Sequence, residues 1–379
     1  MRDGWTYRAL GGICENLDKR RVPITKSDRV SGEFPYYGAS GIVDYVSEYL
    51  FNEDLLLVSE DGANLLARTY PIAFSVEGKV WVNNHAHVLK FPNKESQRFM
   101  EFYLNSISLA PYVSGMAQPK LNQRSLNSIS VPFPPLAEQR RIVGILDEAF
   151  DGIATAQANA ELNLQNARAL FESILNEIFE DPPRSWPQKS LGELSQINSG
   201  GTPLKSTKAF WERGDIPWYT SGELNTIYTS PSKKFITEKG LSQSNAKMFP
   251  KGALLMGMYD TAALKMSILD RNGTFNQAVA GMMPTEKINL LFLLYAIRHV
   301  RPEVLKLRRG VRQKNLSLAK IKAIEVRIPS TVVEQERVLE EILVMKRNSE
   351  RLESLYQRKL AALDELKKSL LHQAFSGQL

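Results

Sequence analysis

The stretch that decides the fold is Pro134-Pro135-Leu136-Ala137-Glu138-Gln139-Arg140-Arg141-Ile142-Val143. A weaker copy follows near the other end of the chain, Ser330-Thr331-Val332-Val333-Glu334-Gln335-Glu336-Arg337-Val338-Leu339. Each copy predicts a helix start, because prolines just upstream disfavour an earlier start and an acidic side chain suits the positive first turn. The chain therefore repeats itself, and each repeat is expected to end in a helix.

Both helices are expected to be long. Apolar residues continue from each copy in steps of three and four, the spacing of a coiled-coil seam, with one extra step of four and with Lys367 as the clear departure. Neither stripe can be buried alone, so we predict that the helices pair, antiparallel, as an intramolecular coiled coil; the alternative is two unrelated exposed helices. The expected pairing residues are Ile142, Leu146, Ile153, Leu164, Phe171, Ile174, Ile178, Val338, Ile342, Met345, Leu352, Leu360, Leu363 and Leu370.

The repeat extends into the parts of the chain between the helices. Leu10-Gly11 is echoed by Leu191-Gly192, Pro35-Tyr36-Tyr37 by Pro217-Trp218-Tyr219, Asn84-His85-Ala86 by Asn276-Gln277-Ala278, and the loop at 115–121 by that at 310–316. Short apolar runs predict buried strands, for example at 55–58 and 253–256, and helical patterns cover 95–106 and 290–299. The predicted fold is α+β, with globular domains at 1–133 and 183–329, long helices at 134–182 and 330–379, and a pseudo-two-fold relation between the repeats.

Composition sets the class of protein. The chain has 379 residues, of which 43% are hydrophobic and 23% charged, which suits a globular protein with two or more cores. No apolar run fits a membrane span or a signal peptide, so a cytoplasmic location is expected. The single cysteine, Cys14, excludes internal disulfides and a cysteine-rich zinc site. The net charge of +7 fits nucleic acid or another acidic partner.

The sequence offers no catalytic centre. It has no GxxxxGK[ST] loop, no glycine-rich turn opening a helix and no Gly-x-Ser-x-Gly elbow. Asp181-Pro182-Pro183-Arg184 lacks the aromatic residue that an amino-methyltransferase motif needs. His85 and His87 could share a metal from one face of a strand, but ordinary packing or polar contact is favoured. We therefore predict no catalytic, cofactor-binding or metal-binding residues.

Basic and amide side chains recur at equivalent places of the repeat. Cations bind phosphates, and glutamine or asparagine can read base edges, so these side chains predict a DNA-binding surface; the alternative is ordinary solvated surface. One loop carries Arg308, Arg309, Arg312, Lys314 and Asn315, and its counterpart carries Gln118, Lys120, Asn122 and Arg124. The other candidates are Lys19, Arg20, Arg21, Lys205, Lys208, Lys233, Lys234, Asn276 and Gln277.

These motifs carry a family resemblance. The stretch at 134–143 resembles the start of the central spacer helix in specificity subunits of type I restriction-modification systems. The ending Ser369-Leu370-Leu371-His372-Gln373-Ala374-Phe375-Ser376-Gly377-Gln378-Leu379 is similar to that family's last helix, and Ser199-Gly200-Gly201-Thr202-Pro203 to an opening of its target recognition domains. The chain departs from the pattern at Ser330-Thr331-Val332 and in lacking Gly-Gly-Thr-Pro in the first domain.

The resemblance implies a non-catalytic subunit that reads double-stranded DNA. Each target recognition domain would read one half of a bipartite asymmetric site, and the helices would set the spacer and dock two methyltransferase subunits. S-adenosylmethionine, ATP and Mg²⁺ would be used by those methyltransferase subunits and by restriction subunits that translocate and cut DNA. This chain itself would bind no cofactor. The rival hypotheses are a coiled-coil interaction scaffold without DNA specificity and a self-contained methyltransferase or nuclease.

Overall fold

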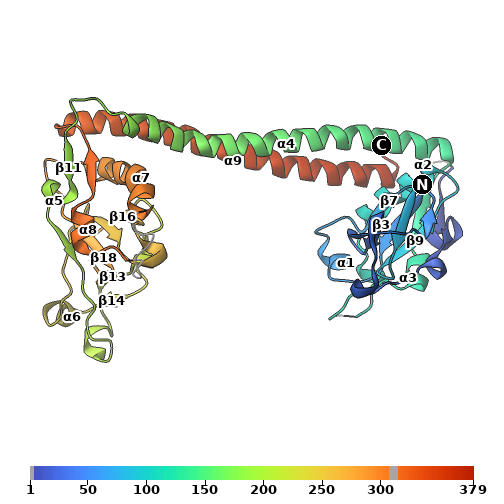
Figure 1. The fold of residues 1–379 in the computed structure, drawn as a ribbon, viewed down its shortest axis with the longest axis horizontal. Helices are drawn as coiled ribbons and strands as arrows, with labels where there is room; N and C mark the ends of the chain where they lie inside the picture. Colours follow the sequence, from blue (N-terminus) through green and yellow to red (C-terminus); the bar gives the residue numbers. More distant parts are fainter. Residues whose placement is uncertain (1–3, 116, 307–314) are drawn as a thin grey trace. The chain divides into compact units, whose positions relative to one another are not determined.

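The computed structural model describes residues 4–115, 117–306 and 315–379. Its contacts divide the chain into two units, one running to Leu162 together with Tyr356–Leu379, and the other comprising Asn163–Leu355. Each unit contains a globular domain of mixed strands and helices and a part of each long helix, α4 (Leu136–Glu180) and α9 (Val332–Ser376) (Figure 1). The predicted α+β class, with a long helix after each domain, is confirmed.

The first unit is built on two four-stranded sheets, ordered β2-β9-β6-β7 and β4-β3-β8-β5, and the pair β1-β10. Its strands are β1 (Thr6–Ala9), β2 (Glu15–Asn16), β3 (Ser31–Gly38), β4 (Gly41–Val46), β5 (Phe51–Asn52), β6 (Leu55–Ser59), β7 (Ala73–Val76), β8 (Lys79–Val82), β9 (Ala86–Lys90) and β10 (Ser130–Phe133). Its short helices are α1 (Asn64–Ala67), α2 (Lys94–Ser106) and α3 (Gln123–Asn127).

The second unit repeats this plan with a four-stranded sheet ordered β12-β18-β15-β16, a three-stranded sheet β14-β13-β17 and the pair β11-β19. Its strands are β11 (Gln188–Ser190), β12 (Ile197–Ser199), β13 (Ile216–Tyr219), β14 (Phe235–Ile236), β15 (Leu254–Gly257), β16 (Met266–Ile268), β17 (Thr274–Phe275), β18 (Val279–Met282) and β19 (Glu325–Arg327). Its short helices are α5 (Leu191–Leu194), α6 (Glu238–Ser242), α7 (Leu290–Lys306) and α8 (Leu318–Lys322).

The central strand of each domain is buried on both faces. Successive side chains of a strand point to opposite faces, so Leu56 and Val58 of β6 join the core under α2, while Leu55 and Leu57 join the core formed with β5 and β8. In β15 the same alternation sends Leu254 and Met256 to one core and Leu255 to another. A continuous apolar run therefore marks a strand between two layers, as the sequence predicted.

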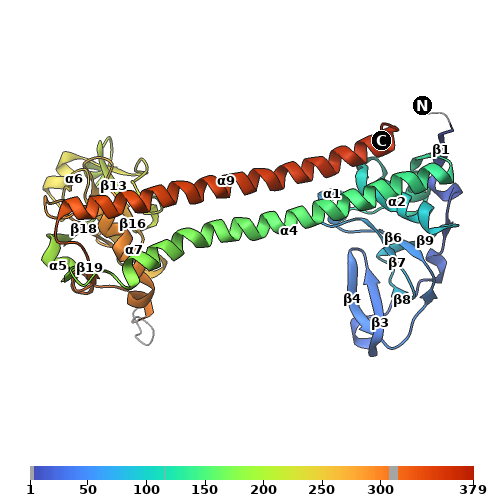
Figure 2. The same cartoon turned by 90° about the horizontal axis from the view of Figure 1, so that it is seen from above.

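In the first unit, α2 lies between the sheet and the long helices (Figure 2). Phe99 and Tyr103 of α2 both meet Phe375 of α9 edge to face, with ring centroids 5.2 and 5.1 Å apart. The α4–α9 pairing is antiparallel, since Arg141 donates to the carbonyl of Leu379 and Gln157 donates to Asp364 at 2.7 Å. Lys367, the departure in the stripe, lies 4.9 Å over the ring of Phe150. A cation on an aromatic face thus replaces the apolar contact.

In the second unit, α7 takes the place of α2. Phe171 and Phe179 of α4 contact Tyr295 and Phe292 of α7, and Val338 and Ile342 of α9 complete the same core. Arg168 pairs with Glu353 at 3.2 Å, and the buried Ser349 hydroxyl donates to the carbonyl of Ala167 at 2.5 Å. The two helices are therefore in contact in this unit as well.

The pairing residues follow the predicted stripe with local departures. Ile142, Leu146, Ile153, Phe171, Val338 and Ile342 are buried, and Leu164, Ile174, Ile178, Leu352, Leu360, Leu363 and Leu370 are partly buried. Met345 is 40% exposed, and Ser349 is buried near it instead. Leu175 and Phe179 are more deeply buried than their neighbours Ile174 and Ile178. The end of α4 packs against α7 as well as α9, which rotates its buried stripe away from a pure two-helix seam.

A buried glutamine fastens each long helix to its own domain. Gln139 is 1% exposed, accepts a hydrogen bond from the Ser96 hydroxyl in the first turn of α2, and donates to the carbonyl of Pro134. Gln335 is also 1% exposed, accepts from the N–H of Asn289 just before α7, and donates to the carbonyl of Pro329. An amide serves here because it supplies both a donor and an acceptor. The glutamine of the repeated Glu-Gln pair therefore has the same structural role in both copies.

Across the described residues, no helix combines the length and the apolar character needed to cross a membrane.

Candidate nucleic-acid interface

Three loops meet in the same way in both domains. In the first, the N–H of Glu60, just after β6, donates to the carbonyl of His85, and the Glu60 carbonyl accepts from the N–H of Leu121, at 2.9 and 2.8 Å. In the second, Met258 makes the same two bonds with Ala278 and Leu316, at 2.9 and 2.7 Å. Leu121 and Leu316, at the ends of the loops that the sequence paired by position, are therefore bonded to equivalent strand ends.

These bonds also correct one step of the sequence alignment. The N–H of Asn83 donates to the carbonyl of Tyr37, and the N–H of Asn276 donates to the carbonyl of Tyr219, each at 3.0 Å. Asn83 is therefore the counterpart of Asn276, and Asn84 is the counterpart of Gln277. The sequence alone paired Asn84 with Asn276, because both precede a similar run of residues.

The loop before α3 is a closed hairpin that carries two of the predicted DNA-binding residues. Ser114 and Lys120 exchange two backbone hydrogen bonds, at 2.9 and 2.8 Å. Gly115 has a φ of +83°, and a Cβ there would lie 2.6 Å from the carbonyl oxygen of Gln118, so this turn requires glycine. The side chains of Gln118 and Lys120 are exposed, and the Lys120 ammonium lies 3.2 Å from Glu60.

Two further predicted residues lie at the start of α3. Asn122 is the N-cap of this helix, and its Oδ1 accepts from the N–H of Ser125 at 2.9 Å. Arg124 is exposed in the first turn. The oxygen of Asn122 therefore has a structural task, whereas Arg124 is available to a ligand.

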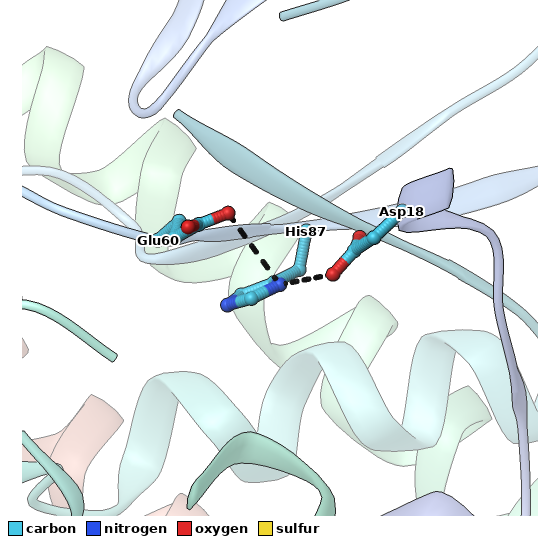
Figure 3. A group of neighbouring side chains, drawn as sticks. All are labelled: Asp18, Glu60 and His87. Carbon is cyan, nitrogen blue, oxygen red and sulfur yellow. Dashed lines mark hydrogen bonds and ion pairs between the residues drawn. The ribbon is translucent and has the colours of Figure 1, made fainter. Parts of the chain in front are cut away.

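A buried ionic cluster connects this loop to the turn at Asp18–Arg20 (Figure 3). His87 is 1% exposed; its Nδ1 lies 2.6 Å from Asp18, and its Nε2 donates to the carbonyl of Leu121 at 2.7 Å. Arg21 donates to Glu60 at 2.7 Å and to the carbonyl of Ala86, and lies 3.5 Å from Asp18. Two segments that the sequence assigned separately to DNA binding are thus held together by one histidine.

The cluster is arranged around two ionised carboxylates. Burial by itself would raise the pKa of Asp18, but the hydrogen bond and charge of His87, the Val88 N–H and the charge of Arg21 hold that pKa below its ordinary value. Burial would likewise raise the pKa of Glu60, and Arg21, His87 and Lys120 lower it overall. Both groups therefore favour the folded state in their charged form.

These lowered pKa values predict acid sensitivity of the first unit. A carboxyl whose folded pKa is lowered adds stability above its unfolded pKa, about 4, and loses it as the pH falls further. We expect the free energy of unfolding to fall between about pH 5 and pH 3, and to fall less steeply in Asp18→Asn, which cannot titrate. Denaturant titrations across this pH range test the prediction, and equal slopes for the two proteins would contradict it.

The same cluster does not have the character of a metal centre. Asp18, Glu60 and His87 offer ligand atoms within 4.8 Å of one another. The cations of Arg21 and Lys120 already contact these carboxylates, and the second nitrogen of His87 is bonded to the backbone. His85, the other histidine considered for a shared metal, contacts Asp61 at 2.9 Å instead. The two histidines thus have separate carboxylate partners.

The three basic residues of the 19–21 segment have different surroundings. Lys19 is exposed. Arg20 pairs with Glu53 at 2.7 Å and lies 4.7 Å over the ring of Phe51, with 48% of its side chain exposed. Arg21 is 12% exposed and engaged in the ionic cluster. The side chains of Lys19 and Arg20 are exposed enough to contact a ligand without rearrangement, whereas Arg21 has a structural role.

In the second domain, the Ser-Gly-Gly-Thr segment passes close to the β17–β18 connection. A Cβ on Gly200 would lie 2.0 Å from the carbonyl oxygen of Phe275, and one on Gly201 would lie 2.2 Å from that of Asn245. The approach brings the Thr202 hydroxyl to 2.5 Å from Oε1 of Gln277. A polar hollow of about 530 Å³ is lined here by Ser199, Gly200, Gly201, Thr202, Asn245, Lys247 and Gln277.

The remaining predicted residues of this domain that the structure describes are exposed or partly exposed. Gln277 is exposed, while Asn276 is partly buried and its Oδ1 accepts from the N–H of Ala278 at 3.1 Å. Asn315 is exposed beside α8. Arg308, Arg309, Arg312 and Lys314 lie outside the described residues. The lysines Lys205, Lys208, Lys233 and Lys234 are exposed, and Lys208 lies 3.8 Å from Glu212.

Sequence reasoning missed several polar residues of these surfaces. Asp18, Glu60 and Asp61 were overlooked because their partners lie far along the chain. Thr202 stood in a recognised motif, but nothing in the sequence linked it to Gln277. Pairing Asn83, and not Asn84, with Asn276 would have made Asn84 the counterpart of the candidate Gln277, and so a candidate itself.

The family model for the type I restriction modification DNA specificity domain matches residues 2–164 and 183–354. A Haemophilus influenzae protein assigned as a type I restriction enzyme specificity subunit is 31% identical over 220 residues, which cover 57% of this chain and 56% of that protein. The EcoR124I/EcoR124II specificity subunit of Escherichia coli is 26% identical over 263 residues, covering 65% and 63%. The matches span less than two thirds of either relative.

Solved structures show the same fold. A chain from a study of complex assembly and conformational transition of the type I R-M system aligns with a TM-score of 0.75 at 18% identity, covering 100% of this chain and 99% of that one. The HsdS subunit from Thermoanaerobacter tengcongensis aligns with a TM-score of 0.64 at 17% identity, covering 100% and 98%. The two family-model matches together include both globular domains and take in more than half of the sequence. The chain belongs to the type I restriction modification DNA specificity domain family.

Proposed function

We propose that this chain is the DNA-recognition subunit of a type I restriction-modification complex, and that it carries no catalytic centre of its own. Each domain would read one half of a two-part site in double-stranded DNA. The observation that carries the proposal is the repeated frame, in which equivalent strand ends hold equivalent loops that expose amides. These are Asn84 and Gln118 in the first domain, and Gln277 and Asn315 in the second. A duplicated reading surface suits a site with two specified parts.

The mechanism divides the work between two kinds of side chain. Exposed cations such as Lys19, Lys205 and Lys208 would contact phosphates and set the position of each domain without reading sequence. Amides and arginines of the loops would then contact base edges in the major groove, where the donor and acceptor pattern differs for each base pair. Affinity and specificity would thus depend on different residues.

The partners we propose are two methyltransferase subunits docked on the long helices, and restriction subunits that join them. S-adenosylmethionine, ATP and Mg²⁺ would act in those subunits, in the cytoplasm where the DNA is. Support comes from the family to which the chain belongs, and from large apolar side chains on α4 and α9 that are exposed and that a docked subunit would cover. They include Leu162, Leu170, Val333, Val344, Leu355 and Leu366.

The salt dependence of DNA binding tests the proposed function. The full chain, assembled with its methyltransferase subunits, should bind mixed-sequence duplex DNA with an affinity that falls linearly on a logarithmic salt scale. Lys205→Ala combined with Lys208→Ala should lower the slope by about 2, one for each lost phosphate contact. Absence of salt-dependent binding by the wild-type assembly would contradict a DNA-reading role and favour an interaction scaffold.

A matched pair of lysines serves as the control. Lys189 and Lys287 are exposed in the same domain, and the backbone of Lys287 contacts Gln335 at the start of α9. Their double alanine variant removes the same charge from another part of the surface. We expect it to leave the slope within experimental error of the wild type.

A further inference from the structure

The connections β8–β9 and β17–β18 contain the same turn. In the first, Oδ1 of Asn83 accepts from the N–H of His85 at 2.8 Å, and in the second, Oδ1 of Asn276 accepts from the N–H of Ala278 at 3.1 Å. An asparagine that bonds the backbone two residues on forms an Asx turn, which fixes the chain between the two positions. Both turns are also tied to the preceding sheet through Tyr37 and Tyr219.

The residue at the middle of each turn is an exposed amide. Asn84 occupies this position in the first domain and Gln277 in the second, and both are exposed, next to the buried Asn83 and Ala278 respectively. An amide offers a donor and an acceptor side by side, the pattern that matches N6 and N7 of adenine in the major groove. A rigid backbone lowers the entropy lost when such a side chain binds.

We propose that Asn84 and Gln277 are the equivalent base-reading side chains of the two domains, each contacting the edge of one adenine in its half of the DNA site. The inference rests on the proposed function and adds to it the residues and the base. It follows from the duplication, because one turn geometry presents one amide in each repeat.

Thr202 is the positioning residue for Gln277. Its hydroxyl donates to Oε1 of Gln277, which fixes the oxygen end of the amide toward Thr202 and the two N–H donors away from it. The oxygen keeps a second lone pair, so it can still accept from a base. Gly200 and Gly201 make this contact possible through their close approach to the backbone of Phe275 and Asn245.

Cations accompany each amide. Lys247 lines the same hollow as Gln277, together with Asn245. In the first domain, His85 follows Asn84 and contacts Asp61, whose backbone is bridged to exposed Lys120. Phosphate contacts position a reading side chain on the duplex, so the neighbouring cations suit a groove-facing role for both turns.

The test selects bound sequences from a randomised duplex library with the full chain assembled with its methyltransferase subunits. Asn84→Ala and Gln277→Ala should each lose preference at one adenine–thymine pair, on the order of tenfold to a hundredfold, in different halves of the motif. Thr202→Val should weaken the preference that Gln277→Ala abolishes, and Thr202→Ser, which keeps the hydroxyl, should retain it. Asn52→Ala on β5 and Gln188→Ala on β11 remove exposed amides elsewhere and should leave the motif unchanged.

The possible failures are distinct. A wild-type motif that Asn84→Ala and Gln277→Ala leave unchanged would overturn this inference and leave the proposed function standing. Loss in the same half for both variants, or a uniform loss at every position, would also overturn it. A wild-type assembly that enriches no motif would count against the proposed function itself.

Discussion

Replacing Ile142 by aspartate is expected to lower the free energy of unfolding of the first unit by about 4 kcal/mol or more. Ile142 is fully buried in the core that joins α2, α4 and the end of α9. The change removes a large apolar side chain and leaves a carboxylate with no water, and both effects have the same sign. Chemical denaturation of the full chain, followed by circular dichroism, measures the loss.

Leu162→Asp is the matched control for this prediction. Leu162 lies on the same helix, in the same unit, and is 56% exposed, so its replacement changes helix propensity and little else. We expect a cost below about 1 kcal/mol. A cost for Ile142→Asp no larger than that of the control would show that the predicted stripe does not hold the helices to the domain.

The second large effect is expected for Arg21→Ala, at about 3 to 5 kcal/mol of unfolding free energy. The guanidinium of Arg21 contacts Glu60, Asp18 and the carbonyl of Ala86 in a site that is closed to solvent on most sides. Its removal leaves two buried carboxylates with the hydrogen bond of His87 to Asp18 and the more exposed ammonium of Lys120 as their remaining side-chain contacts in this cluster. Denaturant unfolding at pH 7 tests the prediction.

Arg20→Ala, one residue earlier, separates stability from DNA binding. Arg20 is about half exposed and makes a surface ion pair, so we expect its loss to cost less than about 1 kcal/mol of stability. On the proposed function, the same variant should weaken DNA binding at constant fold. Equal destabilisation by the two variants would mean that the cluster around Glu60 does not depend on Arg21.

Most of the fold could be predicted from the internal repeat of the sequence. Its helix starts, its apolar stripes and the runs at β6 and β15 are local signals, because they depend on caps, prolines and periodicity within a short window. The sequence showed that Gln139 and Gln335 are equivalent residues of the repeat. It could not show what they bind, because their partners Ser96 and Asn289 lie far from them in sequence.

The candidate site was less predictable for the same reason. The sequence identified basic and amide residues by type and position, but could not tell Arg20, which is exposed, from Arg21, which is enclosed. Spacing alone predicted that Met345 is buried, but Met345 is 40% exposed and Ser349 is buried on the same helix. Interactions between distant segments decide these cases, and no local pattern records them.

The central claim is that the two domains, which are built on a similar plan, each read a separate part of the DNA. The measurement that tests it most directly is the motif bound by the wild-type chain with its methyltransferase subunits, obtained by sequencing duplexes selected from a random library. We predict two groups of specified base pairs with an unspecified stretch between them, each group containing an adenine–thymine pair. A single uninterrupted group, or no enriched sequence, would contradict the account.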